Sequence, residues 1–291
     1  MYLWRRLASQ KWWRDNEDQL LAVAGNGLAI IERPGCKRLH LEVPCRSRNG
    51  AQTLAREFGG GIEKLPGDWL RRFSRNHKGK PLTIGQRLVI TNVGGTSVSR
   101  VRAGRAKSRR QGRSHIIIPA GAAFGTGEHA TTAMSLRLLE QLTRNWKPKW
   151  SIVDLGTGSG ILALAAKCFG ATRVVGIDND PIAISTAKAN ARANKIGNVE
   201  FCIGDVPRWK SWARSRLRRG YGGQVDVVTA NLFSELLIES LPILKGARWL
   251  ILSGILREQE HDVTRALKRN KIDIMQLRQR GKWVAILAAV G

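Results

Sequence analysis

Long apolar runs, paired cysteines and acidic residues are all scarce in this sequence. No apolar run approaches the ~20 residues that a membrane-spanning helix needs, and the first residues, MYLWRRLASQKWW, lack the apolar core of a signal peptide. The four cysteines form no C-x-x-C pair, which is typical of a reduced protein, and the five histidines show no metal-ligand spacing. We therefore expect a cytoplasmic protein that has no membrane segment and binds no metal.

The shortage of acidic residues is uneven along the chain. Lys and Arg number 49 against 22 acids, which gives a net charge of +27. No acid occurs between Asp68 and Glu128, and a second acid-free block covers residues 207–223. The arginine-rich stretch 100–113 and the block 207–223 lack apolar periodicity, so we expect exposed loops. Such blocks commonly bind nucleic acid, although a solvated face without a partner is the alternative for each of them.

Residues 1–65 predict a small α+β domain with the ferredoxin-like order β-α-β-β-α-β. The predicted strands are 2–7, 27–33, 38–43 and 61–65, and the predicted helices are 12–25 and 47–60. Such a domain usually binds a partner and carries no chemistry of its own. Pro66-Gly67 marks a boundary, and we interpret residues 66–80 as a linker with a short helix and 81–291 as a second domain.

From residue 151 onward, apolar strands alternate with helical segments, and residues 273–280 and 283–290 close the chain as a hairpin. Alternation of this kind predicts an α/β fold, with a doubly wound and mostly parallel sheet covered by helices on both faces. Ligands on such sheets bind at the carboxyl ends of the strands. The chemistry is therefore expected where these strands end.

A glycine-rich turn, VDLGTGSG, follows the first of these strands. The strand ends near Asp154, and Gly156, Gly158 and Gly160 then open a helix. Glycine at these places lets the backbone approach a ligand closely. The spacing is G-x-G-x-G and differs from the G-x-G-x-x-G of dinucleotide-binding proteins, so the turn alone does not identify the ligand.

Acidic residues also stand at the ends of the next two strands. Asp178 occupies the place where a carboxylate accepts hydrogen bonds from ribose hydroxyls, and Asp205 lies where an adenine amino group would be. With Asp154, these acids suit a nucleoside ligand that carries positive charge. S-adenosylmethionine, which has a sulfonium and an ammonium, fits this description. A flavin- or NAD-binding domain, or a fold that has lost its ligand, is the alternative.

The fourth strand, in VVTANLF, ends at Asn231 after a nearly continuous apolar run. Its side-chain carbonyl can accept a hydrogen bond from an attacking amine and aim the nitrogen lone pair at a methyl carbon. The alternative is a helix N-cap, a position where Asn is common. Since Ser234 already offers a cap for the following helix, the pattern favours a catalytic Asn231.

The decapeptide AFGTGEHATT, residues 123–132, precedes the glycine turn by about twenty residues. A polar loop that runs into a helix capped by Thr131 or Thr132 can fold over the cofactor, with a Thr hydroxyl at the methionine end and Phe124 against the adenine or methionine. His129 is a candidate base or a structural histidine. An ordinary turn with an N-cap is the alternative, and it leaves His129 and three glycines unexplained, which are Gly125, Gly127 and the preceding Gly121.

Five segments together resemble the PrmA family of lysine methyltransferases that modify a ribosomal protein: AFGTGEHATT, VDLGTGSGILALAA, VVGIDNDPIAISTAKANARAN, VVTANL and LSGIL. The resemblance covers roughly residues 66–291. It implies a seven-stranded S-adenosylmethionine-dependent methyltransferase domain, and a ferredoxin-like domain at residues 1–65 that grips the substrate. The cofactor contacts that we expect are Thr132, Gly156, Gly158, Asp178, Asp205 and Asn231, with Phe124 and His129 close by.

The implied reaction transfers methyl groups to amino groups, on lysine side chains or the N-terminus, of a basic ribosomal protein, large-subunit protein number eleven. An RNA base methyltransferase fits the basic blocks better, but it usually carries Asn-Pro-Pro-aromatic where this chain has NLFS. An RNA- or ribosome-binding protein with a vestigial cofactor site is the third possibility.

The chain departs from the family pattern at the decapeptide and at the two basic blocks. Glu128 and Ala130 stand where the family usually has Thr and Pro. Residues 100–113 and 207–223 are basic where the family is usually short or acidic. Because the family's substrate is also basic, a charge of +27 would repel it unless ribosomal RNA lies between them. We therefore expect these two blocks to contact ribosomal RNA.

Overall fold

The computed structural model of the chain describes residues 2–24, 28–31, 38–45, 47–64, 81–93, 112–119, 129–205 and 224–291. These residues form two compact units, Met1–Arg72 and Phe73–Gly291. The predicted linker helix at 66–80 lies outside the described residues, so the proposed domain boundaries stay a prediction. No described helix combines the length and the apolar character that crossing a membrane requires.

The smaller unit has the predicted β-α-β-β-α-β order. Its elements are β1 (Tyr2–Ser9), α1 (Gln10–Ala24), β2 (Ala29–Ile31), β3 (Arg38–Cys45), α2 (Arg48–Phe58) and β4 (Gly61–Lys64). The strands form an antiparallel sheet in the order β2-β3-β1-β4. A core around Trp4, Leu20, Leu41 and Phe58 is buried between the sheet and the two helices.

Local signals in the sequence fix the ends of α2. The Ser47 side chain accepts a hydrogen bond from the Gly50 amide at 3.1 Å and so caps the first turn. The helix ends at Phe58, because Gly59 has a φ of 66° that continues no right-handed helix. The Gly59 carbonyl accepts the Trp4 indole N–H at 2.7 Å, which ties this end of the helix to β1.

The larger unit holds a seven-stranded sheet in the order β10-β9-β8-β11-β12-β14-β13. Its strands are β8 (Trp150–Leu155), β9 (Ala171–Asp178), β10 (Val199–Ile203), β11 (Val225–Asn231), β12 (Ala247–Leu256), β13 (Ile272–Arg280) and β14 (Trp283–Val290). The first five are parallel, and β13 and β14 are the predicted antiparallel hairpin. The α/β prediction is therefore confirmed.

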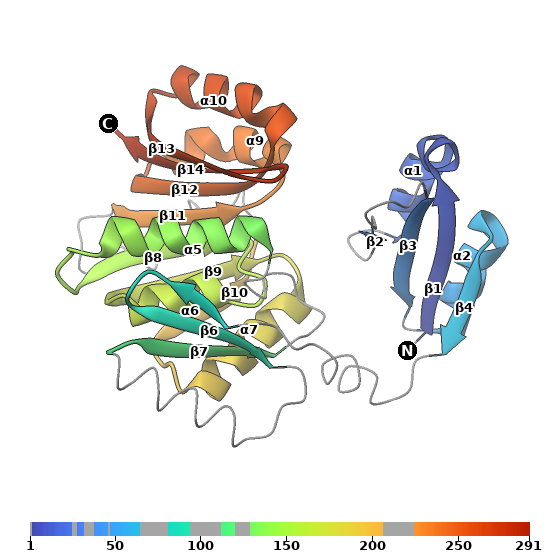
Figure 1. Cartoon of the computed structure of the whole chain (residues 1–291), viewed down its shortest axis with the longest axis horizontal. Coiled ribbons are helices and arrows are strands. Elements are labelled where there is room, and N and C mark those ends of the chain that lie inside the picture. Colours follow the sequence, from blue (N-terminus) through green and yellow to red (C-terminus); the bar gives the residue numbers. More distant parts are fainter. Residues whose placement is uncertain are drawn as a thin grey trace. The chain divides into compact units, whose positions relative to one another are not determined.

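Helices cover both faces of this sheet (Figure 1). They are α5 (Ala130–Thr143), α6 (Ile161–Cys168), α7 (Pro181–Asn194), α9 (Ser234–Leu244) and α10 (Glu260–Arg269), with the short 3-10 helix η3 (Arg257–Gln259) before α10. Helices α5, α6 and α7 pack on one face against Ile152 and Ile251. Helices α9 and α10 pack on the other face against Val153 and Leu252. Successive strand residues point to opposite faces, so buried strands need apolar residues at nearly every position.

A second, three-stranded sheet precedes the seven-stranded one along the chain, and the pairing of its strands into a sheet was not predicted. It consists of β5 (Leu82–Ile84), β6 (Leu88–Val93) and β7 (Ser114–Pro119), with β6 parallel to β7. The Asn194 side chain at the end of α7 adds hydrogen bonds to strand β7 of this sheet. Its Nδ2 donates to the Ile117 carbonyl at 2.7 Å, and its Oδ1 accepts from the Ile117 amide at 2.7 Å.

A buried carboxylate fastens α5 to the turn between β5 and β6. Glu140 has a side chain that is 3% exposed and pairs with Arg144 at 2.8 Å and with Arg87 at 3.3 Å. Arg87 also donates to the carbonyl of Glu140 at 2.6 Å and to the hydroxyl of Thr143 at 2.8 Å. The buried charge is therefore compensated on both sides, which holds α5 in place.

Candidate functional site

The glycine turn joins β8 to α6 at the carboxyl end of the sheet. Gly156, Gly158 and Gly160 all have positive φ, at 68°, 53° and 80°. At Gly160 a Cβ atom would lie 2.9 Å from the Ala187 Cβ and 3.1 Å from the Phe201 ring, so only glycine fits. The turn therefore brings bare backbone to the edge of the sheet, as the sequence predicted.

Asp178, at the end of β9, holds this turn directly. Its Oδ2 accepts the Gly158 amide at 2.9 Å, and its Oδ1 accepts the Asp180 amide at 3.0 Å. Asp205 is exposed and follows Gly204, whose amide donates to the Asp178 carbonyl at 3.0 Å. The two predicted carboxylates are therefore brought to neighbouring strand ends, and each oxygen of Asp178 keeps a lone pair for a further donor.

Asp154, at the end of β8, is buried among hydroxyl donors. Its Oδ2 accepts from the Thr157 hydroxyl and its Oδ1 from the Thr229 hydroxyl, each at 2.6 Å. Burial raises the pKa of Asp154 to about 6, against the lowering effect of the two threonine hydroxyls. A cation bound at this strand end would favour the ionised carboxylate.

Asn231, at the end of β11, lies across from the first turn of α5. Its Nδ2 approaches the Thr132 hydroxyl oxygen at 3.5 Å, the long end of hydrogen-bond distances. Asn231 stands beside Ser253 in the sheet, and the Ser253 hydroxyl is 2.7 Å from that of Ser135 on α5. The start of α5 is therefore fastened to the ends of β11 and β12, and this brings Thr132 and Asn231 together.

Gly254 in β12 supports the backbone that follows Asn231. It has a φ of 88°, and a Cβ atom there would lie 2.4 Å from the Leu232 carbonyl oxygen. The pairing of β12 with β14 shifts register between Ser253 and Ile255, which is a bulge at Gly254. The position of Asn231 thus depends on a glycine on the neighbouring strand.

Two predicted helix caps were wrong. The N-cap of α5 is His129, whose carbonyl accepts the Ala133 amide at 3.1 Å, so Thr131 and Thr132 already lie within the first turn. The N-cap of α9 is Phe233, whose carbonyl accepts the Leu237 amide at 3.0 Å. Ser234 is the first helical residue, and its hydroxyl donates to Gln259 at 2.8 Å. The support that a Ser234 cap gave to a catalytic Asn231 is therefore lost.

His129 is held by neighbours on both sides of its ring. Its Nδ1 is 2.8 Å from the Thr131 hydroxyl, and its ring meets the Trp283 ring edge to face at 5.0 Å. Burial, with a smaller contribution from the Lys282 charge, lowers the pKa of His129. These contacts favour the structural role among the two that the sequence left open.

The sequence analysis did not identify several features of this strand edge. The Thr229 contact was missed, although one polar residue inside an apolar strand was a usable signal. Ile203 and Phe233 are large apolar side chains that are exposed at this edge, at 60% and 79%. Phe124 lies outside the described residues, as do residues 100–111 and 206–223. Among the described residues, no group of three or more His, Cys, Asp or Glu side chains could hold a metal ion.

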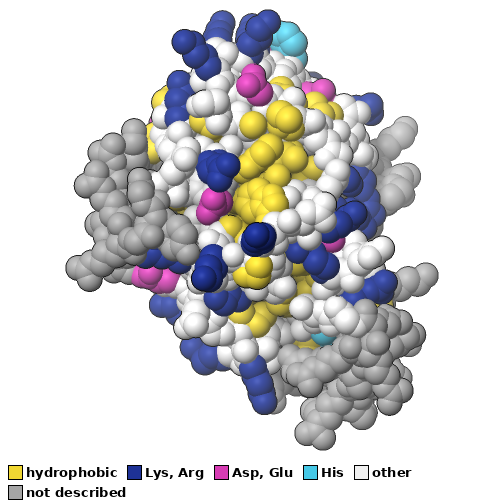
Figure 2. All heavy atoms as spheres, turned by 90° about the vertical axis from the view of Figure 1, so that its left-hand side faces the viewer, with side chains coloured by type: hydrophobic (Ala, Val, Ile, Leu, Met, Phe, Trp, Pro, Cys, Tyr) yellow, Lys and Arg dark blue, Asp and Glu magenta, His cyan; other side chains and the backbone are white. Residues whose placement is uncertain are grey.

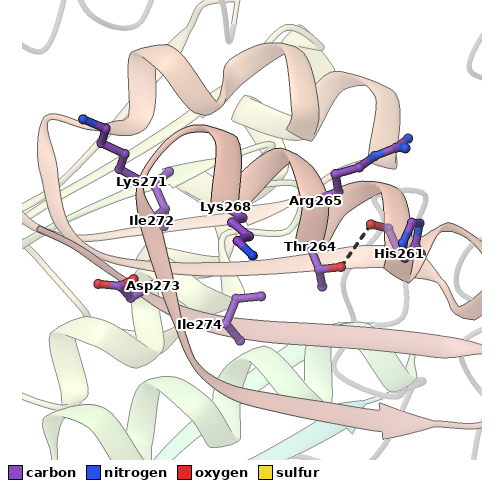
Figure 3. Close-up of a pocket in the computed structure, with 8 residues that line it drawn as sticks. All are labelled: His261, Thr264, Arg265, Lys268, Lys271, Ile272, Asp273 and Ile274. Atoms are coloured by element: carbon purple, nitrogen blue, oxygen red, sulfur yellow. Dashed lines mark hydrogen bonds between the residues drawn. The ribbon is translucent and has the colours of Figure 1, made fainter.

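The hollow drawn in Figure 3 lies at the opposite edge of the sheet from Asp178. It is lined from α10 and β13 by residues that include Arg265, Lys268 and Ile274, and it contains none of the predicted site residues. The candidate site is therefore the strand-end cluster, which we define as Thr132, Asp154, Gly156, Gly158, Asp178, Asp205 and Asn231.

Comparisons with known proteins concern the family and the fold. The family model described as "Ribosomal protein L11 methyltransferase (PrmA)" matches residues 61–290. The ribosomal protein L11 methyltransferase of Symbiobacterium thermophilum is 36% identical over 214 residues, covering 72% of this chain and 62% of the relative. That of Clostridium perfringens is 30% identical over 226 residues, covering 76% and 64%. The chain thus spans less than two thirds of the length of these curated relatives.

A solved structure shares the fold of this chain. The ribosomal protein L11 methylase of Lactobacillus delbrueckii subsp. bulgaricus superposes with a TM-score of 0.56 and is 24% identical. The superposition covers 72% of this chain and 98% of the other. At this identity, the likeness concerns the fold.

Proposed function

This chain belongs to the ribosomal protein L11 methyltransferase (PrmA) family, and on that premise we propose that it transfers methyl groups from S-adenosylmethionine to amino groups of a ribosomal protein. The acceptor groups are lysine side chains or the N-terminal amine. The observation that carries the proposal is the strand-end cluster, in which Asn231 faces Thr132 beside the glycine turn.

The strand-end cluster fits the chemistry of the cofactor. Asp178 has acceptor capacity left for ribose hydroxyls, and Asp205 is exposed next to it for an adenine amino group. Asp154 suits a cationic ligand because its burial is costly for an isolated charge. The cofactor supplies an activated methyl group on a sulfonium. The chain supplies the backbone turn and the carboxylates that would orient it.

Asn231 is the proposed catalytic residue. Its Nδ2 lies 3.5 Å from the Thr132 hydroxyl oxygen, and the side-chain carbonyl would accept a hydrogen bond from an incoming amine. A hydrogen bond from that amine would fix the direction of its lone pair, and positioning of this kind supplies up to ~7–11 kcal/mol. A lysine has a pKa of about 10.4 in water, and a desolvated pocket lowers it, so water can remove the proton. His129 is not needed as a base, and its ring already contacts Thr131 and Trp283.

The proposal extends to the partners of the reaction. The smaller unit has a fold that commonly binds a partner, and we assign it to recognition of the substrate protein. The arginine-rich residues 100–113 and 207–223 are assigned to ribosomal RNA, because the net charge of +27 opposes direct approach of a basic substrate.

The test is transfer of a radiolabelled methyl group to ribosomal protein and to ribosomal RNA, with the wild type and Asn231→Ala. We expect label in the protein, loss of at least ~100-fold in kcat for the variant, and a Kd for the cofactor within about threefold of wild type by calorimetry. Asn270→Ala, which changes an amide at the end of α10, is the control. Label in the RNA would favour the RNA methyltransferase, and absence of cofactor binding would favour the vestigial site.

A further inference from the structure

Three arginines gather on the α5 side of the terminal hairpin. Arg278 and Arg280 pair with Ala285 and Trp283 in the register of β13 and β14. Ala285 and Trp283 belong to the core under α5, so both arginines project from that face. Arg137 of α5 is close enough that the charges of Arg280 and Arg278 act on it. We call Arg137, Arg278 and Arg280 the hairpin arginines.

The hairpin arginines have no carboxylate partner among the residues that the structure describes. Arg278 donates from Nη2 to the Gln141 side chain at 2.8 Å, while its Nε is buried and makes no hydrogen bond. Within the described parts of the chain, Arg137 donates only to the Ala133 carbonyl, at 3.5 Å. Burial, followed by repulsion from Arg280 and Arg278, lowers the pKa of Arg137. Three like charges are thus held together without a counter-charge, which is unfavourable in the absence of a ligand.

Basic charge alone would not single out this place, because it is spread over the protein. Figure 2 shows Lys and Arg side chains outnumbering Asp and Glu across one side of the molecule. Several other described arginines have an acid beside them, as Arg87 and Arg144 have Glu140 and Arg265 has Asp262. The hairpin arginines differ from these in standing together as a group of three without an acid, and the Nε of Arg278 adds a buried donor that has no partner.

We infer that the hairpin arginines form a binding site for the phosphate groups of an RNA backbone. The planar guanidinium matches phosphate oxygens with two parallel hydrogen bonds, and several such groups in a row suit a chain of phosphates. An acidic protein is the weaker candidate, since protein interfaces need an apolar centre. None of the exposed large apolar side chains of the described residues is on this end of the hairpin; the nearest in sequence are Ile274 and Met275.

The site adjoins the strand-end cluster. Arg280 is followed by the Gly281-Lys282 turn, the Lys282 charge acts on His129, and Trp283 contacts the His129 ring. His129 in turn begins the helix that carries Thr132. RNA bound by the hairpin arginines would therefore run past the edge of the sheet where methyl transfer is proposed. The inference itself does not depend on that activity, because it concerns RNA binding by the chain without cofactor.

The test is the salt dependence of binding to a fluorescein-labelled RNA hairpin, measured by anisotropy on the full chain without cofactor. In Arg137→Gln/Arg278→Gln/Arg280→Gln, we expect Kd to rise about tenfold to a hundredfold near 0.15 M salt. The slope of log Kd against log salt should become shallower by about two to three, at ~0.9 for each phosphate lost. The matched control is Arg265→Gln/Lys268→Gln/Lys271→Gln, which removes the same charge around the hollow of Figure 3. Its slope should change by less than about one.

Equal changes in the two triple variants would overturn the inference, because they would show a general effect of charge. Polyglutamate serves as a probe for an acidic protein. If the triple Gln variant lost binding to polyglutamate and kept binding to RNA, the inference would be overturned as well. The triple Arg→Lys variant guards against misfolding: retention of the wild-type slope supports a phosphate site. If the triple Gln variant no longer unfolds cooperatively, the triple Arg→Lys variant is compared with the control triple instead. A slope of log Kd against log salt that becomes shallower by about two in the Arg→Lys variant would then contradict the inference.

Discussion

Asp154 ties the stability of the larger unit to pH in a direction opposite to that of most acids. Burial between Thr157 and Thr229 raises its pKa to about 6 from a reference of 3.8. An acid with a raised folded-state pKa stabilises the fold below its unfolded pKa, and this contribution is lost as the pH rises through the folded value. Asp154→Asn removes the titration. The wild type should therefore gain more stability than the variant when the pH falls from 7 to 5.

The size of this difference follows from the two pKa values. A shift of one unit corresponds to 1.36 kcal/mol, so the whole effect between high and low pH is about 3 kcal/mol. Between pH 7 and pH 5, the folded group takes up most of a proton while the unfolded group stays ionised. Integration over that window predicts that the free energy of unfolding rises by about 1 kcal/mol more in the wild type than in Asp154→Asn when the pH falls from 7 to 5.

The assay is urea unfolding at the two pH values. Unfolding is monitored by hydrogen exchange of peptides from β8 and β11, so that the signal comes from the sheet that holds Asp154. Asp273→Asn, at an exposed position on β13, is the control for loss of a carboxylate. A difference near zero, or one of opposite sign, would show that burial does not raise the pKa of Asp154.

Three further substitutions probe the site and its support. Asp178→Asn weakens charge-assisted hydrogen bonds, so the Kd for S-adenosylmethionine should rise about tenfold to a hundredfold by calorimetry; an unchanged Kd would count against ribose binding. Gly254→Ala pushes on the Leu232 backbone at 2.4 Å and should lower kcat at least about tenfold, whereas Gly281→Ala, which meets no atom, should not. Glu140→Ala leaves Arg87 half-buried and unpaired, and should cost about 2–3 kcal/mol of unfolding free energy, with Glu140→Gln costing less.

Most of the fold could be predicted because its parallel strands are buried on both faces. Segments such as SIVDLG and VDVVTAN show nearly continuous apolar runs, and Gly170 and Pro181 mark helix ends between them. The three-stranded sheet could not be predicted in the same way. Its β6 and β7 pair in parallel across the arginine-rich stretch that carries no apolar pattern, and parallel pairing leaves no turn signal.

The strand ends were predictable as positions, but their contacts were not. The sequence placed Asp178 and Asn231 at two strand ends, and the structure adds the Gly158 amide and the Thr132 hydroxyl as their neighbours. The Thr229 contact to Asp154 requires knowing that β11 pairs with β8, which is a matter of topology. The predictions of the helix caps failed for another reason. A residue can cap a helix with its backbone alone, as His129 and Phe233 do, and the type of side chain does not indicate this.

The doubled hydrogen bond between Asn194 and Ile117 has a consequence for association between copies of the protein. A primary amide that donates to one carbonyl and accepts from the same residue's amide imitates the next strand of a ladder. Bare ladder positions at a sheet margin recruit strands from other molecules and seed aggregates. Asn194 blocks this position on β7 by pairing with the Ile117 amide and carbonyl. Replacement of Asn194 by Leu would expose these two groups and should lower the highest concentration at which the protein remains monodisperse.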